Sequence, residues 1–470
     1  MKQTKIVASI SDLRCDVDFL RELHNASVNV MRINTAHATP EGIKNVINNI
    51  RAVSNQLAIL IDTKGPEIRT TNVEDHIYFK TGDAVRIYGK PSEMTTHECI
   101  NVTYNNIVND LNIGNDMLID DGELALKIVG KSEDCLHAVV QNDARLGSRK
   151  SVNMPGVHIE LPALTEKDKA NIKLAIEEGL DFIAHSFVRS KSDIKAVQDI
   201  LNEYNSDIKI ISKIENQEGV DNIDEIIEAS YGIMIARGDL GIEVPIENIP
   251  GIQRKIIRKC VIANKPVIVA TQMLHSMIKN PRPTRAEVTD IANAIYYRTD
   301  ALMLSGETAS GKYPIEAVKM MVSIAEQAEK DKLRENDIEI PLDENSSVTE
   351  FLAKNAIRAT EQLGVKGIIT DVNTGKTARI LSSYRGPNPV IALCYKEKLV
   401  RQLSLSYGIT PVYQHDKKEM HEQYVTALQM LLQKGFVNMD DKIAHLGNSF
   451  GEKGGTTFLE INNVKDLINS

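Results

Sequence analysis

The sequence predicts an α/β protein: a (β/α)8 barrel, with a small β-barrel lid domain inserted after the third strand and a C-terminal α/β domain. Apolar runs recur before residue 306, polar residues gather where these runs end, and one connection is much longer than the others. The runs expected to be strands are Thr4–Ser9, Asn29–Asn34, Leu57–Thr63, Leu180–Phe187, Ile208–Glu215, Tyr231–Arg237, Pro266–Gln272 and Asp300–Ser305.

These runs are almost continuously apolar and show no polar alternation, as expected for parallel strands covered on both faces. Stretches with a helical period separate most of them. The long connection lies between the runs that begin at Leu57 and Leu180. We therefore predict a barrel domain over residues 1–69 and 159–340, with a separate domain inserted over residues 70–158.

The inserted segment places Gly and Asp where hairpins and tight turns require them, at residues 79–83, 112–116 and 119–123. This pattern predicts short β-strands. A small β domain that is joined to the barrel at two neighbouring points can swing over the barrel mouth as a lid.

The C-terminal domain is predicted over residues 341–470, after a polar and acidic linker at residues 336–345. Ser347 and Glu350 form a capping-box pattern ahead of a helix that reaches Leu363. Strands are expected at Val365–Thr370, Val390–Cys394 and Thr457–Ile461. The turn after the first of these strands is either a phosphate-binding turn facing the 448–455 loop or a glycine turn with a threonine cap. Its residues are Asn373, Thr374, Gly375, Lys376 and Thr377.

The strongest chemical signal is a lysine between two carboxylates. In an extended strand Lys213 and Glu215 share one face, and Asp239 follows the next apolar run. Two carboxylates beside a lysine suit Mg²⁺ bound jointly by the protein and a phosphorylated substrate. A structural ion pair with a turn aspartate is the alternative.

Other polar residues also follow the predicted strands. In a (β/α)8 barrel the chemistry lies at the carboxyl ends of the strands. The residues there are Arg32, Asn34, Asp62, Lys64, Ser186, Lys213, Glu215, Asp239, Thr271 and Glu307. This placement favours an active site over an inert scaffold, although loops of any barrel present polar residues to water.

Composition excludes several classes of protein. The net charge of −9 argues against nucleic-acid binding, and the sequence shows no membrane span and no signal peptide after Met1. The five cysteines are scattered and lack metal-ligand spacing. We therefore expect a cytoplasmic enzyme whose anionic substrates are held by a local cluster of cations.

Several segments, in order and with matching spacing, resemble pyruvate kinases over essentially the whole chain. They include Met-Arg-Ile-Asn at 31–34, Asp-Thr-Lys-Gly-Pro-Glu-Ile-Arg at 62–69, Gly-Ser-Arg-Lys at 147–150, and Leu-Pro-Ala-Leu-Thr-Glu-Lys-Asp at 161–168. Ala-Thr-Gln-Met-Leu at 270–274, Pro-Arg-Pro-Thr-Arg-Ala-Glu at 281–287 and Met-Leu-Ser-Gly-Glu-Thr at 303–308 follow. One short match is weak, but many in order are specific.

The resemblance implies transfer of a phosphoryl group from phosphoenolpyruvate to ADP, the last step of glycolysis, with Mg²⁺ or Mn²⁺ held by Glu215 and Asp239. It assigns Lys213 to the phosphoryl group in flight and Arg32 to the substrate phosphate. The amides at Gly238 and Asp239 would bind the substrate carboxylate. Thr271 would bind substrate near the point of enolate protonation; otherwise it is simply a β-branched strand residue.

The resemblance places Asn34, His37, Arg69 and Lys150 on the nucleotide side, although Lys150 taken alone reads as a surface lysine. It also implies a homotetramer, and a phosphorylated effector at the 373–377 turn.

The chain departs from the family pattern at a few positions. Ala36 stands where a serine usually contributes to K⁺ binding, while Asn34, Asp62 and the Thr63 carbonyl remain available. Glu67 is the residue associated with K⁺-dependent members, so K⁺ dependence is expected. His275 and the Tyr297–Arg298 pair also differ from the usual residues, and we expect altered interfaces there.

Two alternatives remain open. The first is a metal-dependent lyase or aldolase of the phosphoenolpyruvate/pyruvate barrel superfamily, which would need neither the lid nor Lys150. The second is a non-catalytic homologue that senses metabolites; the complete set of Lys213, Glu215, Asp239 and Thr271 argues against it.

Overall fold

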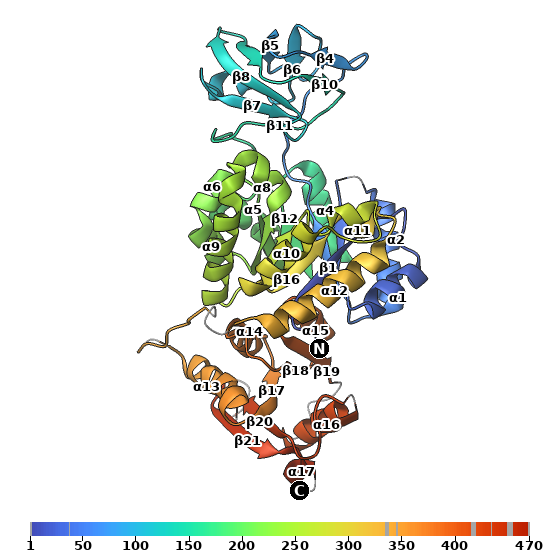
Figure 1. Cartoon of the computed structure of the whole chain (residues 1–470), viewed down its shortest axis with the longest axis vertical. Helices are drawn as coiled ribbons and strands as arrows, with labels where there is room; N and C mark the ends of the chain where they lie inside the picture. The colour runs from blue at the N-terminus through green and yellow to red at the C-terminus, as the bar shows by residue number, and fades with distance from the viewer. Residues whose placement is uncertain are drawn as a thin grey trace.

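Eight parallel strands of the described chain close into a barrel, as predicted (Figure 1). The computed structural model describes residues 2–36, 38–333, 338–344, 346–414, 420–433, 435–448 and 455–468. The barrel strands are β1 (Lys5–Ile10), β2 (Val30–Asn34), β3 (Ala58–Asp62), β12 (Phe182–His185), β13 (Lys209–Ile214), β14 (Gly232–Ala236), β15 (Val267–Ala270) and β16 (Ala301–Leu304). Each coincides with a predicted run, with ends that differ by at most two residues.

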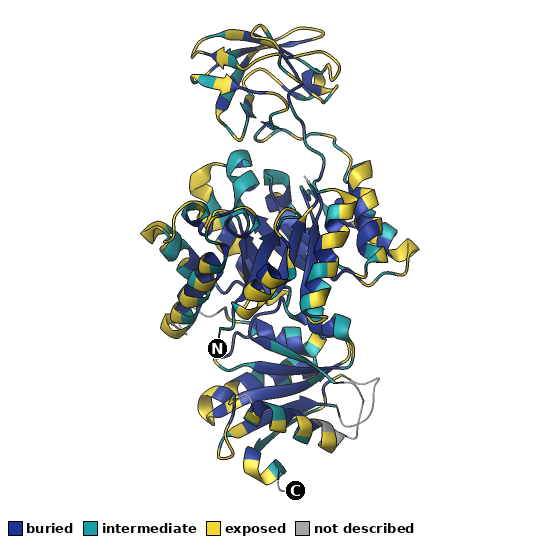
Figure 2. Ribbon diagram, turned by 90° about the vertical axis from the view of Figure 1, so that its right-hand side faces the viewer, coloured by how far each residue is buried: buried dark blue, intermediate teal, exposed yellow. Residues whose placement is uncertain are grey.

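Helices cover the outside of the barrel (Figure 2). The main ones are α1 (Val17–Asn25), α2 (Pro40–Val53), α4 (Glu166–Glu177), α5 (Lys191–Glu203), α7 (Ile223–Ala229), α9 (Ile249–Ile262), α10 (Arg285–Tyr296) and α12 (Pro314–Asp331). Shorter helices are α6 (Gln217–Asp221), α8 (Arg237–Glu243) and α11 (Gly306–Ala309), with 3-10 turns at Ile246–Asn248 and His275–Ile278. Alternate strand residues such as Leu60 and Ile211 fill the barrel interior, while Ile59 and Ile210 pack against the helices. Burial on both faces explains why the runs lack polar alternation.

The inserted segment forms β structure around its own apolar core. Its strands are β4 (Ile77–Phe79), β5 (Ala84–Tyr88), β6 (Cys99–Asn101), β7 (Asp116–Ile119), β8 (Leu124–Lys131), β9 (Leu136–Val140), β10 (Ala144–Leu146) and β11 (Val152–Asn153). They lie in one six-stranded and one two-stranded sheet, with a short helix α3 (Ile107–Asp110). Arg69 bridges to Ser151, so the two connections to the barrel run side by side, as predicted for a lid. Figure 1 shows this unit beyond one end of the barrel.

The C-terminal unit is a five-stranded sheet with helices, in the order β19-β18-β17-β20-β21 over the residues that are described. Its elements are α13 (Val348–Gln362), β17 (Val365–Val372), α14 (Lys376–Ser383), β18 (Val390–Cys394), α15 (Glu397–Leu403), β19 (Ile409–Tyr413), α16 (Met420–Gln433), β20 (Lys442–Gly447), β21 (Phe458–Asn463) and α17 (Val464–Ile468). The predicted capping box at Ser347 and Glu350 is present. β19 and β20 were not among the predicted strands, because short apolar runs are ambiguous between helix and strand.

A buried ion pair joins the C-terminal unit to the barrel. Arg385 donates to Asp300 at 2.6 Å, and each side chain is 4% exposed. Arg385 also donates to the carbonyl of Arg298, which is itself buried and donates to Leu333. The unusual Arg298 thus lies at an internal contact between the two units. The boundaries at residues 70, 158 and 341 remain predictions, and residues 336, 337 and 345 of the expected linker lie outside the described chain.

The cysteines are free in the structure, and in the described residues no helix has the length and apolar character needed to cross a bilayer.

His185, in β12, should make the fold sensitive to acid. The side chain is fully buried, and neither ring nitrogen has a hydrogen-bond partner among the described residues. Burial lowers the pKa of His185 to about 4, although the charges of Asp193 and Asp168 act against that shift. Between an unfolded-state pKa near 6.5 and a folded-state pKa near 4, only the unfolded chain takes up the proton. Acidification therefore lowers the free energy of unfolding by up to ~1.4 kcal/mol per pH unit.

Urea unfolding at about pH 7.5 and 5.5 tests this prediction. Between these two pH values, the free energy of unfolding should fall by ~1.3 kcal/mol more in the wild type than in His185→Ala. The cavity left by the substitution lowers the stability of the variant at both pH values, so it does not affect this difference. Equal losses in the two proteins would show that His185 does not carry the effect.

Candidate active site

Most of the polar residues expected at the carboxyl ends of the strands line one cavity, of about 530 Å³, between the barrel and the inserted unit. Glu307 does not line it and instead accepts the backbone amides of Leu274 and Ser305. Arg32 is two residues beyond Val30 in β2, and Asp62 and Lys213 likewise follow Leu60 and Ile211, which fill the barrel interior. Because side chains alternate along a strand, all three point inward as the layer nearest the mouth. The alternation of side chains along each strand therefore brings charged residues of different strands together at the barrel mouth.

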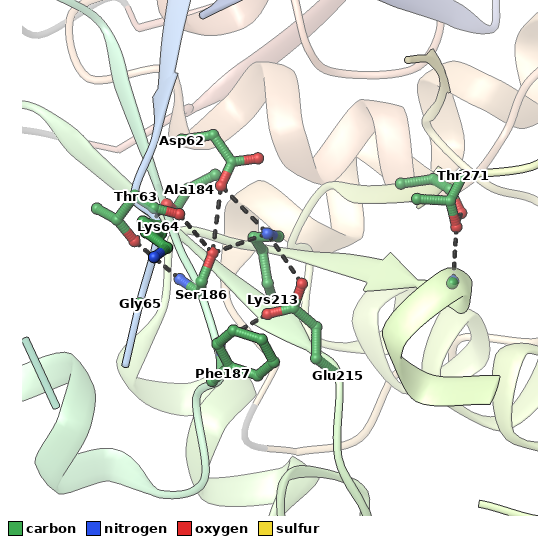
Figure 3. A network of polar contacts seen from close by, with 12 residues as sticks. Asp62, Thr63, Lys64, Gly65, Ala184, Ser186, Phe187, Lys213, Glu215 and Thr271 are labelled. Carbon is green, nitrogen blue, oxygen red and sulfur yellow. Dashed lines mark hydrogen bonds and ion pairs between the residues drawn. The ribbon is translucent and has the colours of Figure 1, made fainter. Parts of the chain in front are cut away.

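Lys213 is the centre of this cluster (Figure 3). Its Nζ lies 2.9 Å from Oε1 of Glu215 and 3.1 Å from Oδ1 of Asp62. It also donates to the hydroxyl of Ser186 at 2.7 Å. Burial alone lowers the pKa of Lys213, but Asp62 and Glu215 outweigh it and raise that pKa above the ordinary lysine value. The ammonium group therefore keeps its charge in a nearly dry position.

Glu215 and Asp239 supply two further carboxylates near Lys213. Glu215 contacts the lysine directly, and the charge of Asp239 affects the pKa of both residues. Burial raises the pKa of Glu215 to about 7 despite the opposing charge of Lys213, and burial also raises the pKa of Asp239. The negative charge of Asp239 raises the pKa of Glu215 further. Two buried carboxylates whose charges are incompletely compensated fit a divalent cation. No group of three or more His, Cys, Asp or Glu residues with metal-ligand geometry occurs in the described chain, so further ligands would come from substrate and water.

Oxygen atoms with the chemistry of a K⁺ site lie at the ends of β2 and β3. Asn34 and Asp62 are register partners in adjacent strands, and both line the cavity. In the structure the side-chain oxygen of Asn34 accepts the Ala36 amide at 3.1 Å, and the Thr63 carbonyl accepts the Ser186 hydroxyl at 2.7 Å. The Asp62 carboxylate is held by Arg32 at 2.7 Å and by Lys213. Burial raises the pKa of Asp62, but Arg32 and Lys213 more than reverse that shift and keep it ionised.

Arg69 and Lys150 face the same cavity from the lid side. Lys150 forms an ion pair of 2.7 Å with Asp120, and Arg69 donates to Glu67 at 2.8 Å. Both cations are about one-third exposed, so these pairs leave them accessible to an anion. Glu67 places a carboxylate, and no cation, beside Arg69 in the cavity wall. His37 lies outside the described residues.

Thr271 and Gly238 do not line this cavity, although the sequence predicts them in the site. They lie together: the Gly238 amide donates to the Thr271 hydroxyl at 2.8 Å. That amide therefore has a partner within the protein. Figure 3 shows Thr271 apart from the group around Lys213. Thr271 follows β15 and is not an ordinary strand residue, because its φ is +69°.

The 373–377 turn lies in the C-terminal unit, after β17 and before α14, and takes no part in this cavity. Gly375 has a φ of +80°, which a glycine tolerates well. The Thr377 hydroxyl lies 3.0 Å from that of Thr456. Residues 449–454 of the loop expected to face the turn lie outside the described chain.

Four cavity residues were missed by sequence reasoning, and one of them is Ser151. Phe187 donates its amide to Glu215 at 2.6 Å, and Asp120 and Asp121 line the lid side. Both aspartates have positive φ, in a segment that the sequence shows only as a glycine-containing turn. Such a turn gives no indication that one of its carboxylates pairs with Lys150.

Comparison with known proteins finds pyruvate kinases that match this chain in sequence. The family model "Pyruvate kinase, barrel domain" matches residues 1–318, and "Pyruvate kinase, alpha/beta domain" matches residues 350–462. The chain is 49% identical to a pyruvate kinase of Borreliella burgdorferi over 99% of this chain and 98% of that protein. It is 41% identical to one of Bacillus licheniformis over the full chain and 81% of that protein.

Among solved structures, a pyruvate kinase from Cryptosporidium parvum superimposes with a TM-score of 0.93 at 35% identity, covering 98% of this chain and 96% of that one. Sequence and fold agree along nearly the whole length. The chain belongs to the pyruvate kinase family.

Proposed function

We propose that Arg32, Lys213, Glu215, Asp239 and Thr271 carry out phosphoryl transfer from phosphoenolpyruvate to ADP in this chain. The observation that supports this most directly is the buried, charged Lys213, which contacts Glu215 and also Asp62, the carboxylate that Arg32 holds. This arrangement suits an anion whose charge moves during reaction, because preorganised charges need no rearrangement in the transition state.

In the proposed reaction, the bond between phosphorus and the enol oxygen breaks, and phosphorus bonds to a β-phosphate oxygen of ADP. Arg32 binds the phosphoryl group before transfer, and Lys213 stabilises its charge in flight. The enolate that remains takes a proton at its terminal carbon and becomes pyruvate, with Thr271 delivering that proton through water. Arg69 and Lys150 hold the nucleotide phosphates, together with Asn34 and His37.

Glu215 and Asp239 would hold Mg²⁺ or Mn²⁺. When bound, this ion neutralises charge on the substrate oxygens. The roles of the protein residues are to fix the ion's position and to exclude water. Glu215 is itself oriented by the Phe187 amide, so its carboxylate cannot rotate freely away from the cavity.

The lid-side cations favour nucleotide-dependent transfer over a lyase or aldolase reaction. Arg69 and Lys150 line the cavity, and a lyase would have no use for them. The assay that decides between these functions measures pyruvate formed from phosphoenolpyruvate and Mg²⁺, with and without ADP. Pyruvate and ATP should appear only with ADP, whereas nucleotide-independent turnover would indicate the lyase alternative. No turnover in a folded protein would indicate the non-catalytic one.

We also propose a K⁺ site made by Asn34, Asp62 and the Thr63 carbonyl. Activity should rise with K⁺, because Glu67 brings no positive charge that would replace the cation. Ala36→Ser adds an oxygen beside Asn34, so it should lower the K⁺ concentration for half-maximal activity several-fold; a ligand oxygen in a polar cation site typically contributes on this scale.

The matched control for this change is Ala38→Ser, which adds a hydroxyl two residues further along and should leave the K⁺ requirement unchanged. Assays use tetramethylammonium buffers freed of K⁺. Full activity of the wild type in such a buffer would refute K⁺ dependence.

We further propose that the 373–377 turn binds a phosphorylated metabolite. Gly375 lies at the start of α14, and the hydroxyls of Thr374 and Thr377 are close by. The buried Arg385–Asp300 pair connects this unit to the barrel, so binding can alter affinity for phosphoenolpyruvate.

Substrate titrations with fructose 1,6-bisphosphate, glucose 6-phosphate, ribose 5-phosphate and AMP test this proposal. One of them should shift half-saturation by about fivefold or more, and Thr377→Val should reduce the shift. Unchanged half-saturation with all four compounds would leave the turn without a regulatory role.

A homotetramer remains an expectation from the resemblance. A cytoplasmic location remains a prediction too, and the free, scattered cysteines support it.

A further inference from the structure

Thr271 has an unfavourable backbone conformation. Its φ is +69° and that of Gln272 is +54°. A β-branched residue seldom adopts a positive φ, because its side chain crowds the backbone. Such a conformation persists only when the surrounding structure enforces it, and it often occurs at functional sites. The contacts that enforce it here can be identified.

One arginine holds the Thr271 backbone. Nη2 of Arg237 donates to the Thr271 carbonyl at 2.7 Å. Nη1 donates to both carboxylate oxygens of Asp290, at 2.9 and 2.7 Å. The Arg237 side chain is only 10% exposed, and Asp290 reaches it from α10. The carboxylate therefore fixes the guanidinium, which in turn fixes the carbonyl of Thr271.

The Thr271 hydroxyl is fixed at the same time. It donates to the Ala270 carbonyl at 2.6 Å and accepts from the Gly238 amide at 2.8 Å. Arg237 and Gly238 are the first two residues of α8, and Asp239 is the third. Thus one short helix start carries the arginine that holds the carbonyl, the amide that orients the hydroxyl, and a proposed metal-binding carboxylate.

We propose that Arg237 and Asp290 are positioning residues for the proton-transfer half of the reaction, acting through Thr271. Neither residue lines the cavity that contains Arg32 and Lys213. Their function is to keep the 271–272 peptide in its strained conformation, and hence to keep the hydroxyl directed beside Gly238 and Asp239. This inference rests on the proposed role of Thr271 and extends it to two residues on different elements.

The proton step can be measured apart from phosphoryl transfer. In D₂O, enolisation removes a methyl proton of pyruvate to solvent, and the enolate returns to pyruvate by taking up a deuteron. Proton NMR of pyruvate with the full-length enzyme, Mg²⁺, K⁺ and ATP follows this exchange. Steady-state assays with phosphoenolpyruvate and ADP give kcat and both KM values for the same samples.

We expect Asp290→Ala to slow methyl exchange at least tenfold while changing both KM values less than threefold. Asp290→Asn keeps one acceptor for Arg237, so its exchange rate should be intermediate. Thr289→Ala, on the adjacent position of α10, should match the wild type. Thermal unfolding of each variant reports whether the fold is retained; Asp290→Asn keeps the test interpretable if Asp290→Ala does not fold.

A double-mutant cycle separates positioning from general structural support. If Asp290 acts through Thr271, Thr271→Ala combined with Asp290→Ala should exchange no more slowly than Thr271→Ala alone. Multiplicative losses in the double variant, or equal falls in exchange and phosphoryl transfer, would overturn the positioning role. If Thr271→Ala itself leaves exchange unchanged, the proposed role of Thr271 fails first, and this inference fails with it. If Thr271→Ala slows exchange but Asp290→Ala does not, only the inference fails.

Discussion

Lys213→Ala is expected to lower kcat by roughly a thousandfold or more while the fold survives. The lysine is buried, charged and in contact with two carboxylates. Its interaction with the phosphoryl group should be strongest when charge is being transferred, so the loss should appear in kcat much more than in KM.

Removing Lys213 leaves Asp62 and Glu215 without their shared cation, so circular dichroism and thermal unfolding must accompany the kinetics. Lys209→Ala is the matched control, because Lys209 begins the same strand at its opposite end and should leave kcat near the wild-type value. If Lys213→Ala keeps a tenth of wild-type turnover, a loss of only ~1.4 kcal/mol, the proposed role is wrong.

Glu215→Gln should reduce activity by roughly a hundredfold or more at ordinary Mg²⁺ concentrations. Glutamine has nearly the same shape, and its amide oxygen can still accept the Phe187 amide. The substitution nevertheless removes one of two carboxylate charges that face the proposed metal position. Because Mg²⁺ prefers charged oxygen ligands, metal affinity should fall, and high Mg²⁺ should restore part of the activity.

Mn²⁺ binding, followed by electron paramagnetic resonance, measures the metal directly and does not depend on turnover. Glu243→Gln is the control, since Glu243 lies on α8, accepts from Asn153 at 2.9 Å and does not line the catalytic cavity. Unchanged Mn²⁺ affinity in Glu215→Gln would rule out this carboxylate as a ligand.

The sequence by itself determined the order of the barrel strands, because each is a local apolar run bounded by polar residues. It also indicated which residues meet at the barrel mouth. Arg32, Asp62 and Lys213 each come two residues after an interior apolar side chain, so strand periodicity and the barrel rule were sufficient. The insertion was visible as an abnormally long connection.

Only the tertiary structure decided which partners these residues have. Nothing near Asp62 in sequence shows that it lies between Arg32 and Lys213, or that Lys150 pairs with Asp120. The positive φ of Thr271 was hidden in the same way, because a β-branched residue after an apolar run reads as part of the strand. Arg237 follows β14, whereas Thr271 and Asp290 belong to the next βα unit, formed by β15 and α10. Local patterns determine where a side chain points, but contacts across the barrel depend on how distant segments pack together.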